Sequence, residues 1–259
     1  MKTRYPAVEG SFYPSDEKEL EAMLKSFDSN VRIEKKGRPR AIISPHAGLI
    51  YSGQTAAFAY KYAEGEKYRS AVIFAPSHRV AFYGISGADY DEYKCCGKSF
   101  RINRELLEKL SKNNGIISVD LAHEHEHSAE VQLPFVQKYL DVESIVVFVY
   151  GETDYRKISY VMDDIISENK DIIIVSTDLS HYHPYEECNR TDSVVAEGIK
   201  ELDAVMAGKG EACGMPGIQA VITSAANKKL KPEILDHRNS GDIINDRSGV
   251  VGYLSAVFI

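Results

Sequence analysis

Two histidines and one cysteine, far apart in the chain, are placed so that they could bind one metal ion. His46 ends the segment Ile-Ile-Ser-Pro-His, and His78 ends a similar segment, Ile-Phe-Ala-Pro-Ser-His. Cys213 lies in Ala-Cys-Gly-Met-Pro-Gly, shortly before a predicted helix. A single histidine after a strand is more often structural, but two at equivalent positions with a third ligand favour a shared site. Residues just past the carboxyl ends of strands meet in one crevice of an open α/β sheet, so we expect these three to converge.

The sequence around Cys213 favours a metal-binding or reactive thiolate. Pro216 and Gly217 are typical of the first turn of a helix. A thiolate near a helix N-terminus is stabilised by the helix dipole, and the thiolate is the form that binds a metal or attacks an electrophile. A buried, inert cysteine is the alternative interpretation, but the two strand-end histidines favour the ligand.

An aspartate and a histidine follow another predicted strand at the same end of the sheet. Asp178 and His181 come shortly after the apolar segment 172–176. A histidine oriented by a nearby aspartate can act as a general acid or base near neutral pH, so we predict a catalytic role for this pair. The alternative is a capped turn in which Asp178 accepts hydrogen bonds from backbone amides.

Three histidines occupy alternate positions between residues 123 and 127. Such a run could bind metal, but a solvent-facing acidic loop is the simpler interpretation for His123 and His125. His127 lies next to a predicted helix start, and Glu130 lies about one turn further on. We therefore expect His127 and Glu130 to line the pocket or to support the ligands.

Composition and charge exclude several kinds of protein. The net charge is −7 and the most basic segment is the short run 34–38, which argues against nucleic-acid binding. No apolar stretch approaches the roughly 20 residues that span a bilayer, and the first residues lack the apolar core of a secretory signal. Phosphate-binding glycine loops, serine nucleophile elbows and metalloprotease helices are absent. We expect a cytoplasmic protein that binds neither nucleic acid nor membrane.

Cysteine usage indicates a reducing compartment. Four cysteines are too few for a disulfide framework in a chain of 259 residues. Cys95 and Cys96 are adjacent, and this spacing does not match a zinc ribbon.

Capping residues and proline predict several helix boundaries. After an opening loop, Ser15 is expected to cap the first helix and Asn103 to cap another. In the segment 128–139, Pro134 either kinks the helix or delays its start. The predicted helices lie at 16–27, 53–62, 104–112, 128–139, 155–168, 186–206 and 217–228.

Strands alternate with these helices along the chain. The predicted strands lie at 40–44, 71–75, 143–150, 171–176, 232–239 and 249–258, and the last two can pair antiparallel. A hairpin is expected within 80–100. Because no repeat or linker interrupts the alternation, we predict one domain over residues 1–259. Its fold is a three-layer α/β/α sandwich with a mostly parallel or mixed sheet.

Six segments spread over the whole length make the chain closely resemble the MEMO (mediator of cell motility) family in its archaeal or bacterial form. Each segment is weak alone, but together they are very specific. They are Pro-Ala-Val-Glu-Gly-Ser-Phe-Tyr-Pro at 6–14, Pro-His-Ala-Gly at 45–48, Pro-Ser-His at 76–78, Glu-His-Ser-Ala-Glu at 126–130, Ser-Thr-Asp-Leu-Ser-His at 176–181 and Cys-Gly at 213–214.

The resemblance implies the fold of class III extradiol dioxygenases, which hold Fe(II) with two histidines and one carboxylate. It makes His46 and His78 the two histidine ligands, and it places Cys213 where those enzymes have the carboxylate. Asp178 and His181 would line the same pocket, with His181 at the acid–base position. A thiolate in place of a carboxylate shifts the preference toward Cu(I) or Zn. Family members have been linked to iron or copper binding, to redox activity and, in eukaryotes, to a phosphotyrosine receptor peptide.

Three functions follow from these residues. The first is a metal-dependent oxidoreductase with iron or copper, and zinc also suits the ligands. The second is a non-catalytic protein whose pocket binds a peptide or a small anionic ligand. The third is a metal-free thiol enzyme with Cys213 as nucleophile. We expect a small molecule or a peptide as the ligand, and the sequence leaves oligomerisation open.

Overall fold

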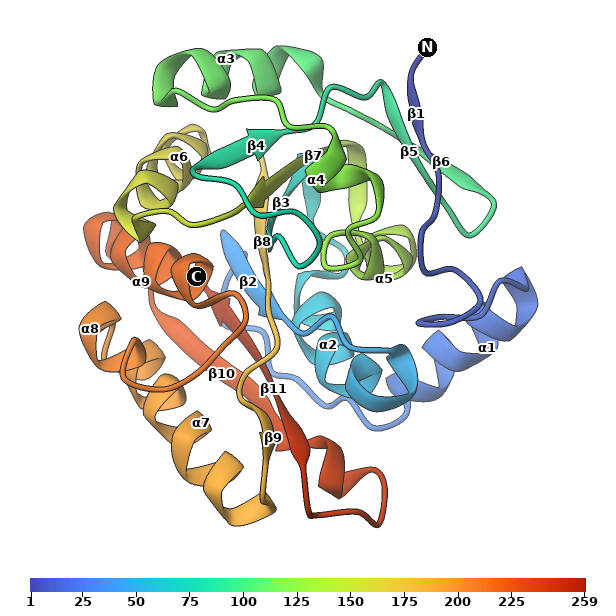
Figure 1. Ribbon diagram of the computed structural model, residues 1–259, viewed down its shortest axis with the longest axis vertical. Coiled ribbons are helices and arrows are strands. Elements are labelled where there is room, and N and C mark those ends of the chain that lie inside the picture. Colours follow the sequence, from blue (N-terminus) through green and yellow to red (C-terminus); the bar gives the residue numbers. More distant parts are fainter.

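A mixed eight-stranded β-sheet forms the centre of the protein, as the computed structural model of residues 1–259 shows (Figure 1). Four parallel strands make up its middle, in the order β2 (Ala41–Ser44), β8 (Ile172–Ser176), β3 (Lys67–Pro76) and β7 (Asp141–Tyr150). Strands β2 and β8 are buried along their whole length. Parallel strands are covered on both faces, which is why they consist of continuous apolar runs.

Antiparallel strands complete the two edges of this sheet. On one side, β4 (Ile85–Gly87) pairs with β7. On the other side, β11 (Val250–Phe258) pairs with β2, and both β10 (Pro232–Asn239) and β9 (His181–His183) pair with β11. The prediction of a mixed sheet, and of antiparallel pairing between the last two strands, is confirmed.

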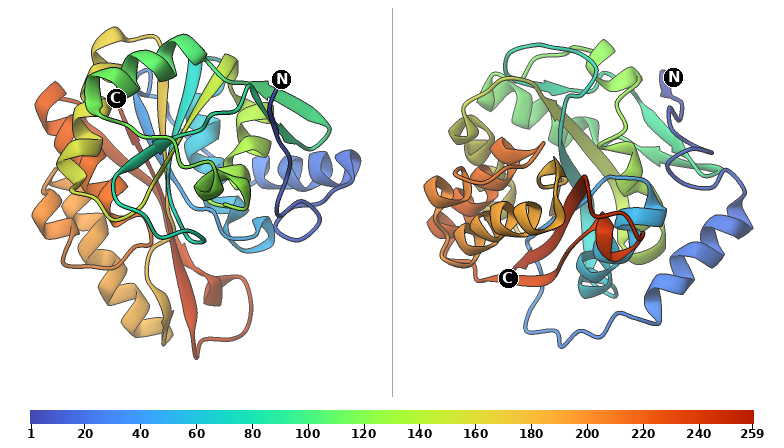
Figure 2. Two further views of the ribbon diagram at one scale, coloured as in Figure 1. Left: turned by 45° about the horizontal axis from the view of Figure 1, so that its top comes forward. Right: turned by 60° about the horizontal axis from the view of Figure 1, so that its bottom comes forward.

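Helices cover both faces of the sheet, so the predicted three-layer α/β/α sandwich is confirmed. One layer holds α1 (Glu17–Asp28), α2 (Leu49–Ala63) and α5 (Leu133–Tyr139). The other holds α3 (Arg104–Asn114), α6 (Tyr155–Glu168), α7 (Tyr185–Lys200), α8 (Ala204–Ala207) and α9 (Met215–Lys228). Both views in Figure 2 show the sheet between these layers. Short helices α4 (Leu121–Glu124), η1 (Glu130–Gln132) and η2 (Ser240–Asp242) lie in the connections. None of the helices combines the length and the apolar character needed to cross a bilayer.

Two predicted helix starts are wrong. The carboxylate of Asp16, not the hydroxyl of Ser15, caps α1 by accepting the backbone N–H groups of Lys18 and Glu19. Helix α2 begins before Gly53, which lies inside it. A Cβ at this position would come within 2.5 Å of the Phe27 ring, so the glycine allows α1 and α2 to pack closely.

Two segments that were each predicted as one helix, 128–139 and 186–206, each form two shorter helices in the structure. In the first, η1 precedes α5 and Pro134 lies in the first turn of α5, so the proline delays the helix rather than kinking it. In the second, α7 ends before Leu202, which has a φ of +53°, and Asp203 then caps α8. A single continuous helix over 186–206 was therefore wrong.

A second, three-stranded sheet joins the N-terminus to the predicted hairpin. The hairpin consists of β5 (Glu92–Cys95) and β6 (Lys98–Arg101), which confirms the expectation for 80–100. Strand β1 (Thr3–Arg4) pairs parallel with β5, so the opening of the chain is not all loop.

A buried ion pair anchors the N-terminal segment to the sandwich. Arg4 is 2% exposed and its guanidinium pairs with the fully buried carboxylate of Glu130. The same carboxylate accepts hydrogen bonds from the backbone N–H groups of Ala7 (2.8 Å) and Val8 (3.0 Å) and from the hydroxyl of Tyr13 (2.6 Å). Because both charges are desolvated, each depends on the other being present.

We expect Arg4→Met to lower the free energy of unfolding by about 3–5 kcal/mol, because it leaves the Glu130 carboxylate buried without its cation. Urea denaturation of both proteins measures this difference. Lys67→Met is the control, since Lys67 forms an exposed pair with Asp141 and its loss should leave stability nearly unchanged. Equal midpoints for the two variants would contradict the prediction.

Candidate metal centre

Three loops that carry candidate residues leave the same edge of the sheet from neighbouring strands. His46 follows β2, Asp178 follows β8 and His78 follows β3, and these strands are adjacent in the order β2–β8–β3. Their parallel register places Ser44 of β2 beside Ser176 of β8. The three loops therefore begin close together at the carboxyl edge.

Cys213 lies in the loop before α9. The start of α9 packs tightly against the ends of the strands and brings this loop to the same edge. A Cβ on Gly214 would lie 2.7 Å from the side chain of Thr177, and one on Gly217 would lie 2.6 Å from the hydroxyl of Tyr150. Glycine at both positions lets the start of α9 approach the sheet. This approach brings the Cys213 sulfur to the histidines.

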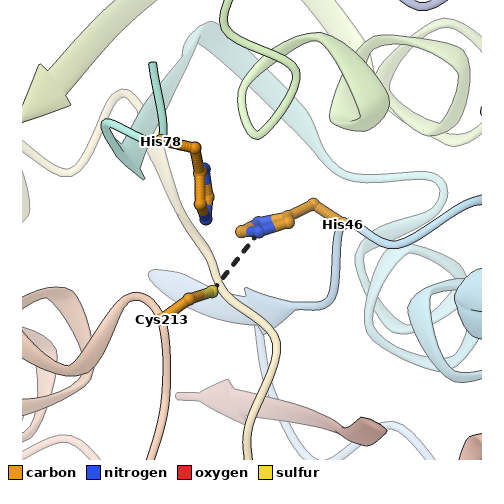
Figure 3. A group of neighbouring side chains, drawn as sticks. All are labelled: His46, His78 and Cys213. Atoms are coloured by element: carbon orange, nitrogen blue, oxygen red, sulfur yellow. Dashed lines mark hydrogen bonds between the residues drawn. The ribbon is translucent and has the colours of Figure 1, made fainter. Parts of the chain in front are cut away.

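His46, His78 and Cys213 converge on one point (Figure 3). Their ligand atoms all lie within 4.8 Å of one another, and Sγ of Cys213 is 3.4 Å from Nε2 of His46. The two imidazole rings meet edge to face with centroids 5.2 Å apart. Donors that share an ion at 2.0–2.3 Å in tetrahedral geometry lie about 3.3–3.8 Å apart, so the sulfur–nitrogen distance suits a shared ion.

Hydrogen bonds to Ser176 set the tautomer of His46. The Ser176 hydroxyl donates to the carbonyl of Ser128 (2.6 Å) and accepts from the amide of Gln132 (2.8 Å). With its only proton used, it must accept from Nδ1–H of His46, 2.9 Å away. Nε2 is then unprotonated and faces Cys213. Burial, followed by the nearby His127 and His78, lowers the pKa of His46 well below its ordinary value, so the ring is neutral at pH 7.

Glu126 orients His78, and its role was missed in the sequence. Its buried carboxylate accepts the backbone N–H of His78 (2.5 Å) and Nδ1–H of the same ring (2.9 Å), as well as the backbone N–H of Ser128 (3.0 Å). Burial by itself would raise the pKa of this carboxyl, but the adjacent His127 ring and the hydrogen bonds from His78 and Ser128 hold it far below its usual range. The sequence signals were its position beside His127 and its place in the family-like segment 126–130, but neither indicated that it would turn inward.

The Cys213 thiol is less acidic than its place before a helix predicts. Burial and the negative charge of Asp178 raise the pKa of Cys213 to about 12. Hydrogen bonds favour the thiolate in part, since the backbone N–H of Asp178 donates to the sulfur at 3.2 Å and the Thr177 hydroxyl lies 3.6 Å away. The expected stabilisation by the dipole of α9 is therefore outweighed in the metal-free protein.

Asp178 does not orient His181, so that expectation is wrong. Its buried carboxylate instead accepts the backbone N–H groups of His46 (2.8 Å) and Ala47 (3.3 Å), which is close to the capped-turn alternative. Burial raises the pKa of Asp178 above its usual value. His181 donates Nδ1–H to the carbonyl of Leu179 at 2.8 Å. This hydrogen bond leaves Nε2 as the available ring nitrogen of His181.

Two cavities adjoin the converging side chains. One, of about 390 Å³, has His127, Asp178 and His181 in its wall together with aromatic rings that include Phe12 and Tyr253. The ring of His127 is 4.6 Å from that of His78 and 5.0 Å from that of Phe12, measured between centroids. The other, of about 350 Å³, has Cys213 in its wall beside Tyr150 and Pro216. His127 thus lies at the pocket, as expected.

The remaining candidates from the sequence lie elsewhere. Glu130 was expected in the pocket or beside the ligands, but its carboxylate binds Arg4 and the N-terminal backbone. His123 was expected in solvent, yet it is 1% exposed and hydrogen-bonded to Ser86 and Tyr93. His125 is exposed, as expected.

Comparison with known proteins gives a consistent result along the whole chain. A family model described as Memo-like protein matches residues 4–257. A MEMO1 family protein of Aquifex aeolicus is 32% identical over 271 residues, covering all of both chains. Proteins of the same description from Archaeoglobus fulgidus (33% identical over 269 residues) and Saccharolobus islandicus (35% over 280) each cover 98% of this chain, and 99% of their own length is matched.

In metal-free protein at pH 7 we expect Cys213 to be alkylated slowly by iodoacetamide. A pKa of about 12 keeps the thiol protonated at pH 7. The rate should rise about tenfold per pH unit up to about pH 10, because the thiolate is the reacting form. Peptide mapping of chelator-treated protein follows the reaction, with Cys213→Ser to identify the peptide. Fast alkylation at pH 7 with no further rise would instead support the metal-free thiol enzyme.

Proposed function

The chain belongs to the Memo-like family, and on that premise we propose that it is a metal-dependent oxidoreductase whose ion is held by His46, His78 and Cys213. One observation carries this proposal. Three side chains from separate loops bring two ring nitrogens and a sulfur within 4.8 Å of one another. Both histidines use Nδ1 for hydrogen bonds to the protein, which leaves Nε2 for an ion.

The donor set fits a transition metal. Imidazole nitrogens suit iron, copper and zinc, and a thiolate adds a preference for Cu(I) or zinc. Three protein ligands, rather than four, are typical of catalytic sites that keep a position open. Hydrogen bonds from ligand histidines to carboxylates, as between His78 and Glu126, are typical of metal sites. We therefore infer iron or copper as the cofactor, with zinc as the metal that also suits these ligands.

A bound iron or copper ion would supply one-electron and dioxygen chemistry. The protein's own residues would bind the substrate and move protons. His181 would accept or release a proton at Nε2, since its Nδ1–H is held by a carbonyl. Asp178 would keep the His46 loop in place through two backbone hydrogen bonds. Phe12 and Tyr253 would flank the ligand and exclude water from this cavity.

The cavity beside His181 supports a small-molecule ligand. Its volume of about 390 Å³ lies within the range of small-molecule sites, and its wall is mostly apolar with a few polar groups. A single side chain of a peptide would also fit. The cytoplasmic location, and a partner that is neither nucleic acid nor membrane, stay predictions from the sequence.

We expect His46→Ala and Cys213→Ser to lose about tenfold or more of the metal that the unaltered protein retains when purified anaerobically without added metal, since each removes one of three ligands. Metal content by mass spectrometry measures this loss. His125→Ala is the matched control, because this exposed histidine belongs to the same histidine-rich run and should leave the metal content unchanged.

Two results would count against this proposal. One is the absence of metal from the unaltered protein, and the other is equal metal in His46→Ala. A binding protein with a non-catalytic pocket predicts something different again. In that case His46→Ala would keep its ligand affinity, and oxygen consumption with catechols would stay at background in every sample.

We expect Glu126→Gln to weaken metal affinity by about 10–100-fold, because the carboxylate that orients the His78 ring is lost. The amide oxygen can still accept hydrogen bonds, so the fold should be retained. Competition with a chromophoric chelator measures the affinity. Glu124→Gln, an exposed neighbour two residues away, is the control. Unchanged affinity in Glu126→Gln would restrict this carboxylate to a structural role.

A further inference from the structure

Cys95 and Cys96 place two sulfur atoms side by side in the small sheet, away from the carboxyl edge where Cys213 lies. Their Sγ atoms are 3.1 Å apart. Neighbouring residues of a strand normally point to opposite faces of the sheet. Here Cys95 is the last residue of β5, and Cys96 begins the turn to β6, which brings its side chain round to the same side.

Cys96 has a positive φ, a backbone conformation that is unusual for cysteine. Cys95 pairs with Lys98, so Cys96 and Gly97 form a two-residue hairpin turn with φ values of +52° and +72°. Turns of this kind favour Asn-Gly or Gly-Gly, because side chains other than those of Asn, Asp and Gly rarely adopt positive φ. Such outliers cluster at functional positions.

The surroundings of the pair restrict its possible reactions. Cys95 and Cys96 are 1% and 2% exposed. The Cys95 thiol donates to the Tyr13 hydroxyl at 3.3 Å, and the Cys96 backbone N–H donates to Glu9 at 3.2 Å. The other two cysteines contact different groups, Cys188 the carboxylate of Asp192 and Cys213 the ring of His46. Each sulfur of the pair therefore has only its neighbour as a thiol partner.

We propose that Cys95 and Cys96 form a redox-reactive vicinal dithiol, which a low-molecular-weight disulfide oxidises to a disulfide between the two neighbouring residues. One sulfur, as thiolate, attacks the small disulfide, forms a mixed disulfide and releases one small thiolate. The second sulfur loses its proton and attacks the mixed disulfide, which forms the Cys95–Cys96 bond and releases the second small thiolate. The protein loses two electrons and two protons, and the small disulfide is reduced to two thiols.

The hydrogen bonds around the pair indicate how the oxidised form differs. A disulfide has no S–H, so the Tyr13 hydroxyl loses the hydrogen bond that it accepts from the Cys95 thiol. Its own hydroxyl proton still goes to Glu130, so the N-terminal anchor is kept. Because both sulfurs are buried, the hairpin must open locally before a small disulfide can reach them, so the reaction is slow. Burial also raises the pKa of the Cys95 thiol well above its ordinary value. We expect closure over hours, within the range known for disulfide formation.

The experiment incubates reduced, folded protein with oxidised glutathione and then quenches it with acid. We expect the number of free thiols, alkylated after unfolding, to fall from four to two. The intact mass should fall by two hydrogen atoms without added glutathione, and peptide mapping should place the change at residues 95–96. Four remaining thiols after prolonged incubation would overturn the proposal.

Variants separate this reaction from general oxidation. Cys96→Ser and Cys95→Ser each should keep their three thiols or gain a single glutathione, with no loss of two hydrogens. Cys188→Ser is the matched control, a buried cysteine elsewhere, and it should still close the pair and retain one thiol. Loss of two hydrogens in Cys96→Ser would show that other cysteines react and would also overturn the proposal. Circular dichroism before oxidation checks that each variant is folded.

Discussion

The parallel pairing of β2, β8 and β3 is the constraint on which the candidate site depends. Because these strands are neighbours with the same direction, the loops that follow them open at one edge of the sheet. Two of these loops bring His46 and His78 to within a ring-centroid distance of 5.2 Å, although 32 positions separate them in the chain. The third loop supplies Asp178, whose carboxylate accepts a hydrogen bond from the backbone of His46 in the first loop. The last ligand, Cys213, depends on the close approach of α9, which glycine at two positions allows.

Hydrogen bonds then determine which nitrogen of each histidine ring faces the candidate site. His46 and His78 both use Nδ1 to bind the protein, but their acceptors differ, since one is the Ser176 hydroxyl and the other is the Glu126 carboxylate. One acceptor is charged and the other is neutral, so the two histidines are not equivalent toward an ion. Buried charges around the site are compensated mainly by hydrogen bonds from backbone amides and from histidines. Hydrogen bonds within the protein therefore hold the candidate ligands in place.

The N-terminal segment contributes to the same arrangement from outside the sheet. The Arg4–Glu130 pair fixes the first residues, and this segment carries Phe12 onto the ring of His127 at the cavity. The fold also places the cysteines of the two proposals in different parts of the molecule. Cys213 faces two histidines at the carboxyl edge, whereas Cys95 and Cys96 face each other in the small sheet. A thiol surrounded by nitrogen donors suits metal binding, and two adjacent thiols suit exchange with disulfides.

The sequence by itself determined the layered fold, most strands and the side chains that meet at the edge, because buried parallel strands are apolar runs and their ends are marked by proline, glycine and histidine. It did not determine which polar residues turn inward. Glu126 and Glu130 lie four positions apart in one acidic, histidine-rich run, yet one orients His78 and the other binds Arg4 from the far end of the chain. It also predicted that Asp178 would orient His181, whereas its carboxylate binds the His46 loop. Only the tertiary structure decided these partners, because a buried charge takes the hydrogen bonds that packing brings within about 3 Å, and packing is a property of the whole chain.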